Sequence, residues 1–92
     1  MTEVDETLQE RGERYGDFGD HAHLTQELKY VMRCSNRWPS LPSFMKEALE
    51  MIAHKISRVL TGDPHYKDSW HDIQGYAKLV EDRVDEEETK EI

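Results

Sequence analysis

Acidic and basic side chains gather on one side of a predicted helix in the middle of the chain. Within residues 43–61 this polar arc comprises Glu47, Glu50, His54 and Arg58. Each helical residue advances about 100° around the axis, so the four side chains span roughly 80°. Two carboxylates three positions apart meet over one turn and can share a hard cation such as Mg²⁺. The arc is therefore a candidate metal site, although an ordinary solvent-exposed helix face has the same residue types.

A second group of carboxylates follows in the next predicted helix. Asp68 and Asp72 are four positions apart, and Gly75 shares their face. A glycine inside a helix costs about 1 kcal/mol relative to alanine, so Gly75 suggests a close approach by a ligand or by a neighbouring helix. If both helices are antiparallel neighbours, their carboxylates form one cluster, which is either fully solvated or a cation site. The predicted Mg²⁺ ligands are Glu47, Glu50, Asp68 and Asp72.

Such a metal ion would carry the phosphates of a nucleotide and polarise an attacking water, with Glu50 as the predicted catalytic residue. Arg58 is a candidate phosphate ligand because its planar fork can bind phosphate through two hydrogen bonds. Lys55 lies near the edge of an apolar stripe, where it would either contact phosphate or extend along the core edge towards water. Arg11 and Arg14 flank glycines whose backbone N–H groups offer a further phosphate cradle. We predict Arg14, Lys55 and Arg58 as phosphate-binding residues.

The N-terminal elements are predicted from capping residues and glycines. Thr2 with Asp5 predicts a helix start, and this helix is expected to end near Gly12. Three glycines within residues 11–20 predict an ordered loop there. Asp20 is the expected cap of a second helix, along which apolar residues recur at helical spacing.

Two further helices follow a connecting loop over residues 35–42. The third is predicted over Ser43 to Thr61 and ends at Gly62. Its apolar stripe comprises Met45, Leu49, Ile52, Ile56 and Val59. The fourth begins near Asp68, and steps of three and four residues predict a packing seam of Trp70, Ile73, Ala77, Val80 and Val84. The sequence therefore predicts an all-α bundle of about four helices, possible as a monomer or completed by dimerisation.

Length and charge limit the other properties. The 92 residues suffice for one domain, expected over residues 1–84, followed by an acidic tail over residues 85–92. Residues 81–92 carry −5 of the net charge of −8. Since the sequence has no basic stripe, non-specific binding to duplex DNA is not expected. The polar N-terminus and the lack of a long apolar stretch predict a cytoplasmic protein without a membrane span. Since 35% of the residues are charged and 36% hydrophobic, self-association of helical faces is expected.

Four stretches of the sequence have the character of motifs: Arg14-Tyr-Gly-Asp-Phe18, Glu47-Ala-Leu-Glu-Met-Ile-Ala-His-Lys55, Gly62-Asp-Pro64 and Asp68-Ser-Trp-His-Asp72. In these stretches the chain resembles an uncharacterised family of small phage and prophage proteins. The resemblance implies a phage origin and hence the host cytoplasm, but no activity. The chain is also similar to the all-α nucleotide pyrophosphohydrolases of the MazG type, which bind magnesium through a Glu-x-x-Glu pair and a Glu-x-x-Asp pair. Glu47 and Glu50 match the first pair, whereas Asp68 and Asp72 are spaced by four positions instead of three.

The predicted function is binding of nucleotide phosphates through a divalent metal. The bound nucleotide would either be hydrolysed, from a nucleoside triphosphate to a monophosphate and pyrophosphate, or be sequestered. A different hypothesis is a non-enzymatic phage protein that binds and inhibits a host protein, for example through its acidic end. A ligand-free structural oligomer is a third. His71-Asp72, together with His21 and His54, also resembles the metal site of histidine–aspartate phosphohydrolases.

Overall fold

The computed structural model describes residues 2–91, and the side chains of residues 2–86. Within this part the chain is all-α, as predicted, and contains no strand. The elements are α1 (Glu3–Tyr15), α2 (Phe18–Arg33), the short 3₁₀ helix η1 (Trp38–Ser40), α3 (Ser43–Thr61) and α4 (Lys67–Glu91). None of the described helices combines the length and the apolar character that crossing a membrane requires.

The start of α1 is confirmed, but its end is not where glycine predicts it. Thr2 and Asp5 form the reciprocal capping box, and the helix then runs through Gly12 to Tyr15. The predicted loop over residues 11–20 is wrong, because only two residues between α1 and α2 are non-helical. One glycine costs a helix about 1 kcal/mol, which an otherwise regular hydrogen-bond ladder tolerates.

Asp17, and not the predicted Asp20, caps α2. Its side chain accepts a hydrogen bond from the backbone N–H of Asp20 at 3.0 Å. Asp20 lies in the first turn of α2, where its negative charge still favours the positive end of the helix dipole. The cap therefore lies three residues earlier than the sequence suggests.

The turn between α1 and α2 crosses the end of α3 at two glycines. Gly16 has φ 84° and ψ −170°, a conformation open essentially to glycine alone. A Cβ on Gly16 would lie 1.9 Å from the carbonyl oxygen of Thr61, and one on Gly62 would lie 2.4 Å from the carbonyl carbon of Tyr15. The two backbones are thus in direct contact. This crossing fixes the end of α1 beside the end of α3.

The bounds of α3 are confirmed from Ser43 to Thr61, with Gly62 as its C-cap. The fourth helix begins at Lys67, one residue before the prediction, and continues to Glu91. Its backbone therefore runs unbroken through the expected start of the acidic tail at residue 85. The side chains of residues 87–92, on which most of the tail's predicted role depends, lie outside the described part.

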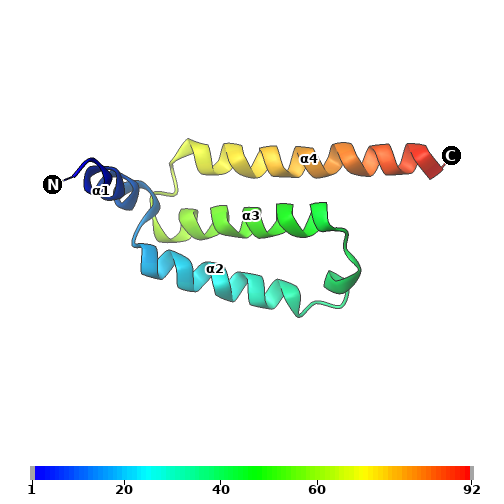
Figure 1. Cartoon of the computed structure of the whole chain (residues 1–92), viewed down its shortest axis with the longest axis horizontal. Coiled ribbons are helices and arrows are strands. Elements are labelled where there is room, and N and C mark those ends of the chain that lie inside the picture. The colour runs from blue at the N-terminus through cyan, green and yellow to red at the C-terminus, as the bar shows by residue number, and fades with distance from the viewer. Residues whose placement is uncertain (1, 92) are drawn as a thin grey trace.

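Helices α2, α3 and α4 lie side by side in one layer, with α3 in the middle, while α1 lies at one end (Figure 1). Along the seam between α2 and α3, Ser57 is fully buried and donates a hydrogen bond to the carbonyl oxygen of His21 at 2.9 Å. Among the residues whose side chains are described, the buried hydrophobic ones are Ala48 and Ala53. Small residues let the helices approach closely, but they bury little apolar surface.

The apolar stripe of α3 is not the buried side of the helix. Leu49 remains 41% exposed and Ile56 38% exposed, whereas α3 buries Ala48, Ala53 and Ser57. The predicted seam on α4 is likewise incomplete, since Trp70 is 50% exposed. In a single layer, the central helix packs through its two flanks. Its apolar stripe therefore faces out of the layer.

Candidate functional site

The carboxylates predicted as Mg²⁺ ligands on α3 point in different directions. Glu50 faces α2, where Arg33 donates hydrogen bonds to its Oε1 from Nε at 3.2 Å and from Nη2 at 2.9 Å. Glu47 is exposed on the other flank, in a shallow groove that it shares with Leu79 of α4. The predicted catalytic residue is thus occupied by an ion pair with its neighbouring helix.

The two aspartates of α4 have partners of their own. Asp72 Oδ2 lies 2.7 Å from Lys55 Nζ, and this ammonium lowers the pKa of the Asp72 carboxyl below its usual value. Asp68 accepts a hydrogen bond from the Tyr66 hydroxyl at 3.0 Å. Lys55, a predicted phosphate ligand, is only 12% exposed and neutralises Asp72 instead.

The register of the two helices explains why the carboxylates stay apart. Lys55 lies opposite Asp72, and the Arg83 guanidinium lies over the Phe44 ring at 5.5 Å. Glu47 is eight residues before Lys55, which places it about 12 Å further along the helix axis. Among the described residues, no group of three or more His, Cys, Asp or Glu side chains is placed to hold a metal ion. The expected cluster of four carboxylates does not form. Mg²⁺ binding stays a prediction, and it has no support from the arrangement of these side chains.

Gly75 also has no close neighbour. A Cβ placed there would meet nothing within 4 Å, leaving aside its chain neighbours and its own helix. The interpretation that a neighbouring helix requires this glycine is therefore wrong. Gly75 lines a shallow, open depression with His71, Asp72, Tyr76 and Leu79.

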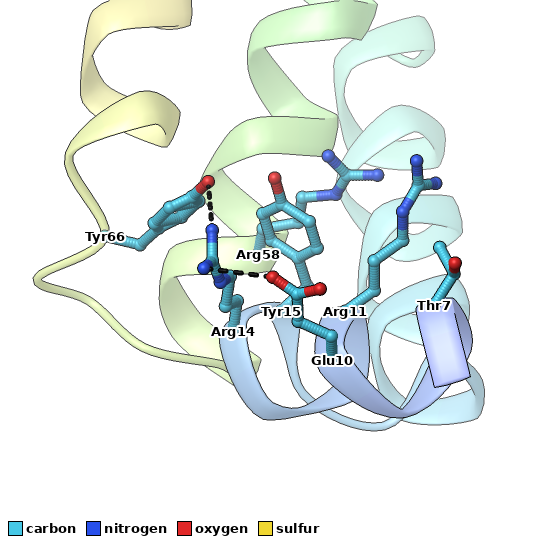
Figure 2. Close-up of a pocket in the computed structure, with 7 residues that line it drawn as sticks. All are labelled: Thr7, Glu10, Arg11, Arg14, Tyr15, Arg58 and Tyr66. Carbon is cyan, nitrogen blue, oxygen red and sulfur yellow. Dashed lines mark hydrogen bonds and ion pairs between the residues drawn. The ribbon is translucent and has the colours of Figure 1, made fainter. Parts of the chain in front are cut away.

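A basic cleft instead lies where α1 meets the end of α3 and the loop before α4. It has a volume of about 360 Å³. We call it the arginine cleft; its lining residues are Thr7, Glu10, Arg11, Arg14, Tyr15, Arg58 and Tyr66 (Figure 2). Two of the three predicted phosphate ligands, Arg14 and Arg58, thus line the same cleft. The glycine crossing at Gly16 and Gly62 brings these distant segments together.

Arg14 is held in place by neighbours on both sides. Its Nη1 donates a hydrogen bond to the Tyr66 hydroxyl at 2.8 Å, and its Nη2 lies 3.0 Å from Glu10 Oε1. The hydrogen bond to Tyr66, followed by the Glu10 carboxylate, raises the pKa of Arg14. The Tyr66 hydroxyl in turn donates a hydrogen bond to Asp68, and this hydrogen bond raises the pKa of the hydroxyl. This chain of hydrogen bonds fixes one wall of the cleft.

Arg58 and Arg11 are less satisfied. The Arg58 guanidinium stacks on the Tyr15 ring, with its central carbon 4.1 Å from the ring centroid. Its Nε is buried and has no hydrogen-bond partner in the described part of the chain. Arg11 is exposed, and none of the described side chains forms an ion pair or hydrogen bond with it. In Figure 2 both guanidinium groups lie on the side of the Tyr15 ring away from Tyr66.

A histidine pair lies next to the cleft. The rings of His21 and His54 meet edge to face, with centroids 4.5 Å apart. His21 is buried, and neither of its ring nitrogens has a hydrogen-bond partner among the described residues. Burial, followed by the nearby positive charge of Arg58, lowers the pKa of His21 and lowers that of His54 to about 4. Both rings are therefore neutral at pH 7, and their neutrality limits the positive charge around Arg58.

Sequence reasoning found part of this site. Arg14 and Arg58 were predicted as phosphate ligands and Arg11 as part of a cradle, whereas Tyr15 was not among the predicted site residues. Tyr66 was missed, because a tyrosine in a loop carries no helical periodicity that assigns it to a face. Comparison with known proteins finds no match, since no family model, no curated protein and no solved structure matches the chain.

Proposed function

We propose that this protein binds a nucleotide through its phosphate groups in the arginine cleft. The observation that carries the proposal is that three arginines line one cleft in a chain whose net charge is −8. Like charges repel, so three arginines around one cleft are unfavourable unless anions compensate them. Of the lining residues, Glu10 alone supplies a carboxylate, and it is paired with Arg14.

Phosphate fits this arrangement better than an isolated carboxylate does. A guanidinium can donate two parallel hydrogen bonds to phosphate oxygens, and Arg11, which has no partner among the described side chains, is free to do so. The volume of about 360 Å³ falls within the range of small-molecule sites. The rings of Tyr15 and Tyr66, whose centroids are 5.5 Å apart, supply aromatic surface beside the phosphate position. Aromatic surface next to arginines favours a nucleotide over inorganic phosphate.

Calorimetry tests the proposal, with a nucleoside triphosphate, the corresponding monophosphate and inorganic phosphate titrated separately into the full chain. We expect the triphosphate to bind most tightly, since it offers most phosphate oxygens. Arg11→Gln and Arg58→Gln should each weaken this binding by about 10-fold or more, because each removes a charge-assisted pair of hydrogen bonds. Arg11→Gln is the cleaner variant, as it breaks no described contact within the chain.

Arg37→Gln is the matched control. Arg37 is exposed and precedes η1, the short helix between α2 and α3, so its replacement changes the net charge equally but leaves the cleft intact. Its dissociation constant should stay within about threefold of the unmodified chain, the change expected from long-range charge alone. Equal weakening by Arg11→Gln and Arg37→Gln, or no binding of any nucleotide, contradicts the proposal.

The same titrations with and without Mg²⁺ separate the cleft from the predicted metal site. Binding that needs Mg²⁺, is lost in Glu50→Gln and is kept in Arg11→Gln would favour the metal site. Binding without Mg²⁺ that depends on Arg11 supports the cleft. The proposal concerns binding; hydrolysis to monophosphate and pyrophosphate is a separate prediction, measured by pyrophosphate release.

The alternative function, binding and inhibition of a host protein, predicts a different outcome. A pull-down from host lysate would then capture one stoichiometric partner regardless of added nucleotide. Unchanged capture by Arg11→Gln would show that the arginine cleft takes no part in it.

A further inference from the structure

The chain exposes more surface than a folded monomer of its size. Its accessible surface is 7088 Å², whereas a compact protein of 10.9 kDa exposes about 5600 Å². Its radius of gyration is 16.1 Å, against about 12 Å for a compact chain of 92 residues. Part of the excess of about 1500 Å² comes from α4, which continues beyond α3. The rest reflects the single layer of helices, whose described part buries the hydrophobic residues Ala48 and Ala53.

One face of this layer exposes the apolar stripe of α3, whereas the other carries the polar arc and the arginine cleft. On α3, Ile56 and Arg58 are two residues apart, which separates them by about 160° around the axis. Arg58 lines the arginine cleft, so Ile56 points to the opposite side of the layer. Leu49 and Leu60 share the direction of Ile56 and are 41% and 65% exposed. The apolar stripe of α3 thus faces away from the cleft.

Both outer helices add apolar residues to this side. On α2, Val31 lies about 160° from Arg33, the residue that contacts Glu50 of the polar arc. On α4, Trp70 lies about 180° from Leu79, which shares a groove with Glu47 of the polar arc. Both residues are at least half exposed. We call the resulting surface the open face; it comprises Val31, Leu49, Ile56, Leu60 and Trp70.

We propose that a second copy of the chain covers the open face, so that the protein is a homodimer of two helical layers. A stable homodimer buries about 1000 Å² or more per subunit, and this chain exposes about 1500 Å² more than a compact monomer of its mass. The described part of the layer buries few hydrophobic residues, Ala48 and Ala53, and chains with so small a core often depend on their partner for stability. A second copy is the partner present whenever the chain is made. The second copy also matches the open face in shape, since one flat layer of helices can pack on another, as in helical bundles.

The dimer leaves the charged side of each layer outside. Arg58 and the other residues of the arginine cleft lie opposite the open face, so each subunit keeps an accessible cleft. Dimerisation therefore goes beyond the proposed nucleotide binding and does not depend on it. Loss of one would not imply loss of the other.

Light scattering and sedimentation of the full chain test the proposal. The expected mass is twice the chain mass of 10.9 kDa, and the melting temperature should rise with protein concentration, as it does for a dimer that unfolds on dissociation. Ile56→Glu should weaken association by about 100-fold or more, because it places a charge in the interface. Leu79→Glu is the matched control, since Leu79 is 62% exposed on the opposite side, and it should leave the mass unchanged.

Each outcome decides the matter. A dimer with a concentration-dependent melting temperature that Ile56→Glu dissociates or unfolds, and that Leu79→Glu retains, supports the proposal. A folded monomer at all concentrations overturns it, including a monomer that captures an unrelated protein through the same face. A dimer that survives Ile56→Glu overturns it as well, because the subunits would then meet elsewhere.

Discussion

Acidification should destabilise the fold through the pair formed by His21 and His54. His54 contacts His21 of α2, and the positive charges near it belong to Arg58 and Lys55 on α3 and to Lys29 on α2. Burial and these charges lower the pKa of His54 to about 4, from 6.5 in an unfolded chain. Between these two values the unfolded chain binds a proton that the folded chain does not. Stability should therefore fall as the pH falls from about 6.5 towards 4, and His54 should contribute no further loss below that.

The magnitude follows from the pKa difference. The difference corresponds to at most about 3.4 kcal/mol of unfolding free energy, at 1.36 kcal/mol for each tenfold change in proton affinity. Because the His54 ring is only partly buried, solvent screens the charges around it, and we expect about 1–2 kcal/mol. His21 adds to the loss in the same direction, since its pKa is also lowered.

Urea unfolding at a series of pH values and one fixed protein concentration measures this loss, with His54→Gln as the comparison. The variant should show a smaller slope of unfolding free energy against pH in this window, while its behaviour below pH 4 should match that of the unmodified chain. An NMR titration of the imidazole signals measures the pKa directly. An ordinary pKa near 6.5 for His54, or an unchanged slope in His54→Gln, would refute the reasoning.

Further predictions concern the glycine crossing and the Lys55 ion pair. Gly16→Ala should destabilise the fold by about 3 kcal/mol or more in urea unfolding, because the added Cβ meets the Thr61 carbonyl and the backbone conformation suits glycine alone. Gly12→Ala should instead stabilise it by about 0.5–1 kcal/mol, since Gly12 is helical and its Cβ would meet nothing; destabilisation there would contradict the described path of α1. Asp72→Asn should lower the free energy of unfolding by about 1 kcal/mol at pH 7, because it leaves the nearly buried Lys55 ammonium unpaired. The difference from the unmodified chain should vanish in acid, where Asp72 is protonated. A difference that persists in acid would exclude the ion pair as its cause.

The sequence predicted the elements better than it predicted their contacts. The bounds of α3 followed from a regular apolar period and the stop at Gly62. The α1–α2 junction did not follow, because a sequence does not tell which of three glycines uses a conformation closed to other residues. Gly16 does, whereas Gly12 and Gly19 lie within helices.

The predicted metal cluster failed for a related reason. A helical wheel gives the direction of a side chain around its own axis, but not its level against the next helix. Lys55 opposite Asp72 sets that level, and no pattern within either helix specifies the pairing. Likewise, the apolar stripe of α3 was recognisable as apolar, but a single chain does not reveal whether its own helices or another subunit cover it. Tyr66, in a loop, had no signal at all.

The slight packing of α1 has a consequence for how this protein can diversify. The helix buries no residue, yet it supplies Thr7, Glu10 and Arg11 to the arginine cleft. Substitutions at these three positions can change the surface that binds the ligand, while packing among α2, α3 and α4 stabilises the fold. Ligand preference can thus drift among relatives, or be redesigned in a library, with little penalty in thermal tolerance.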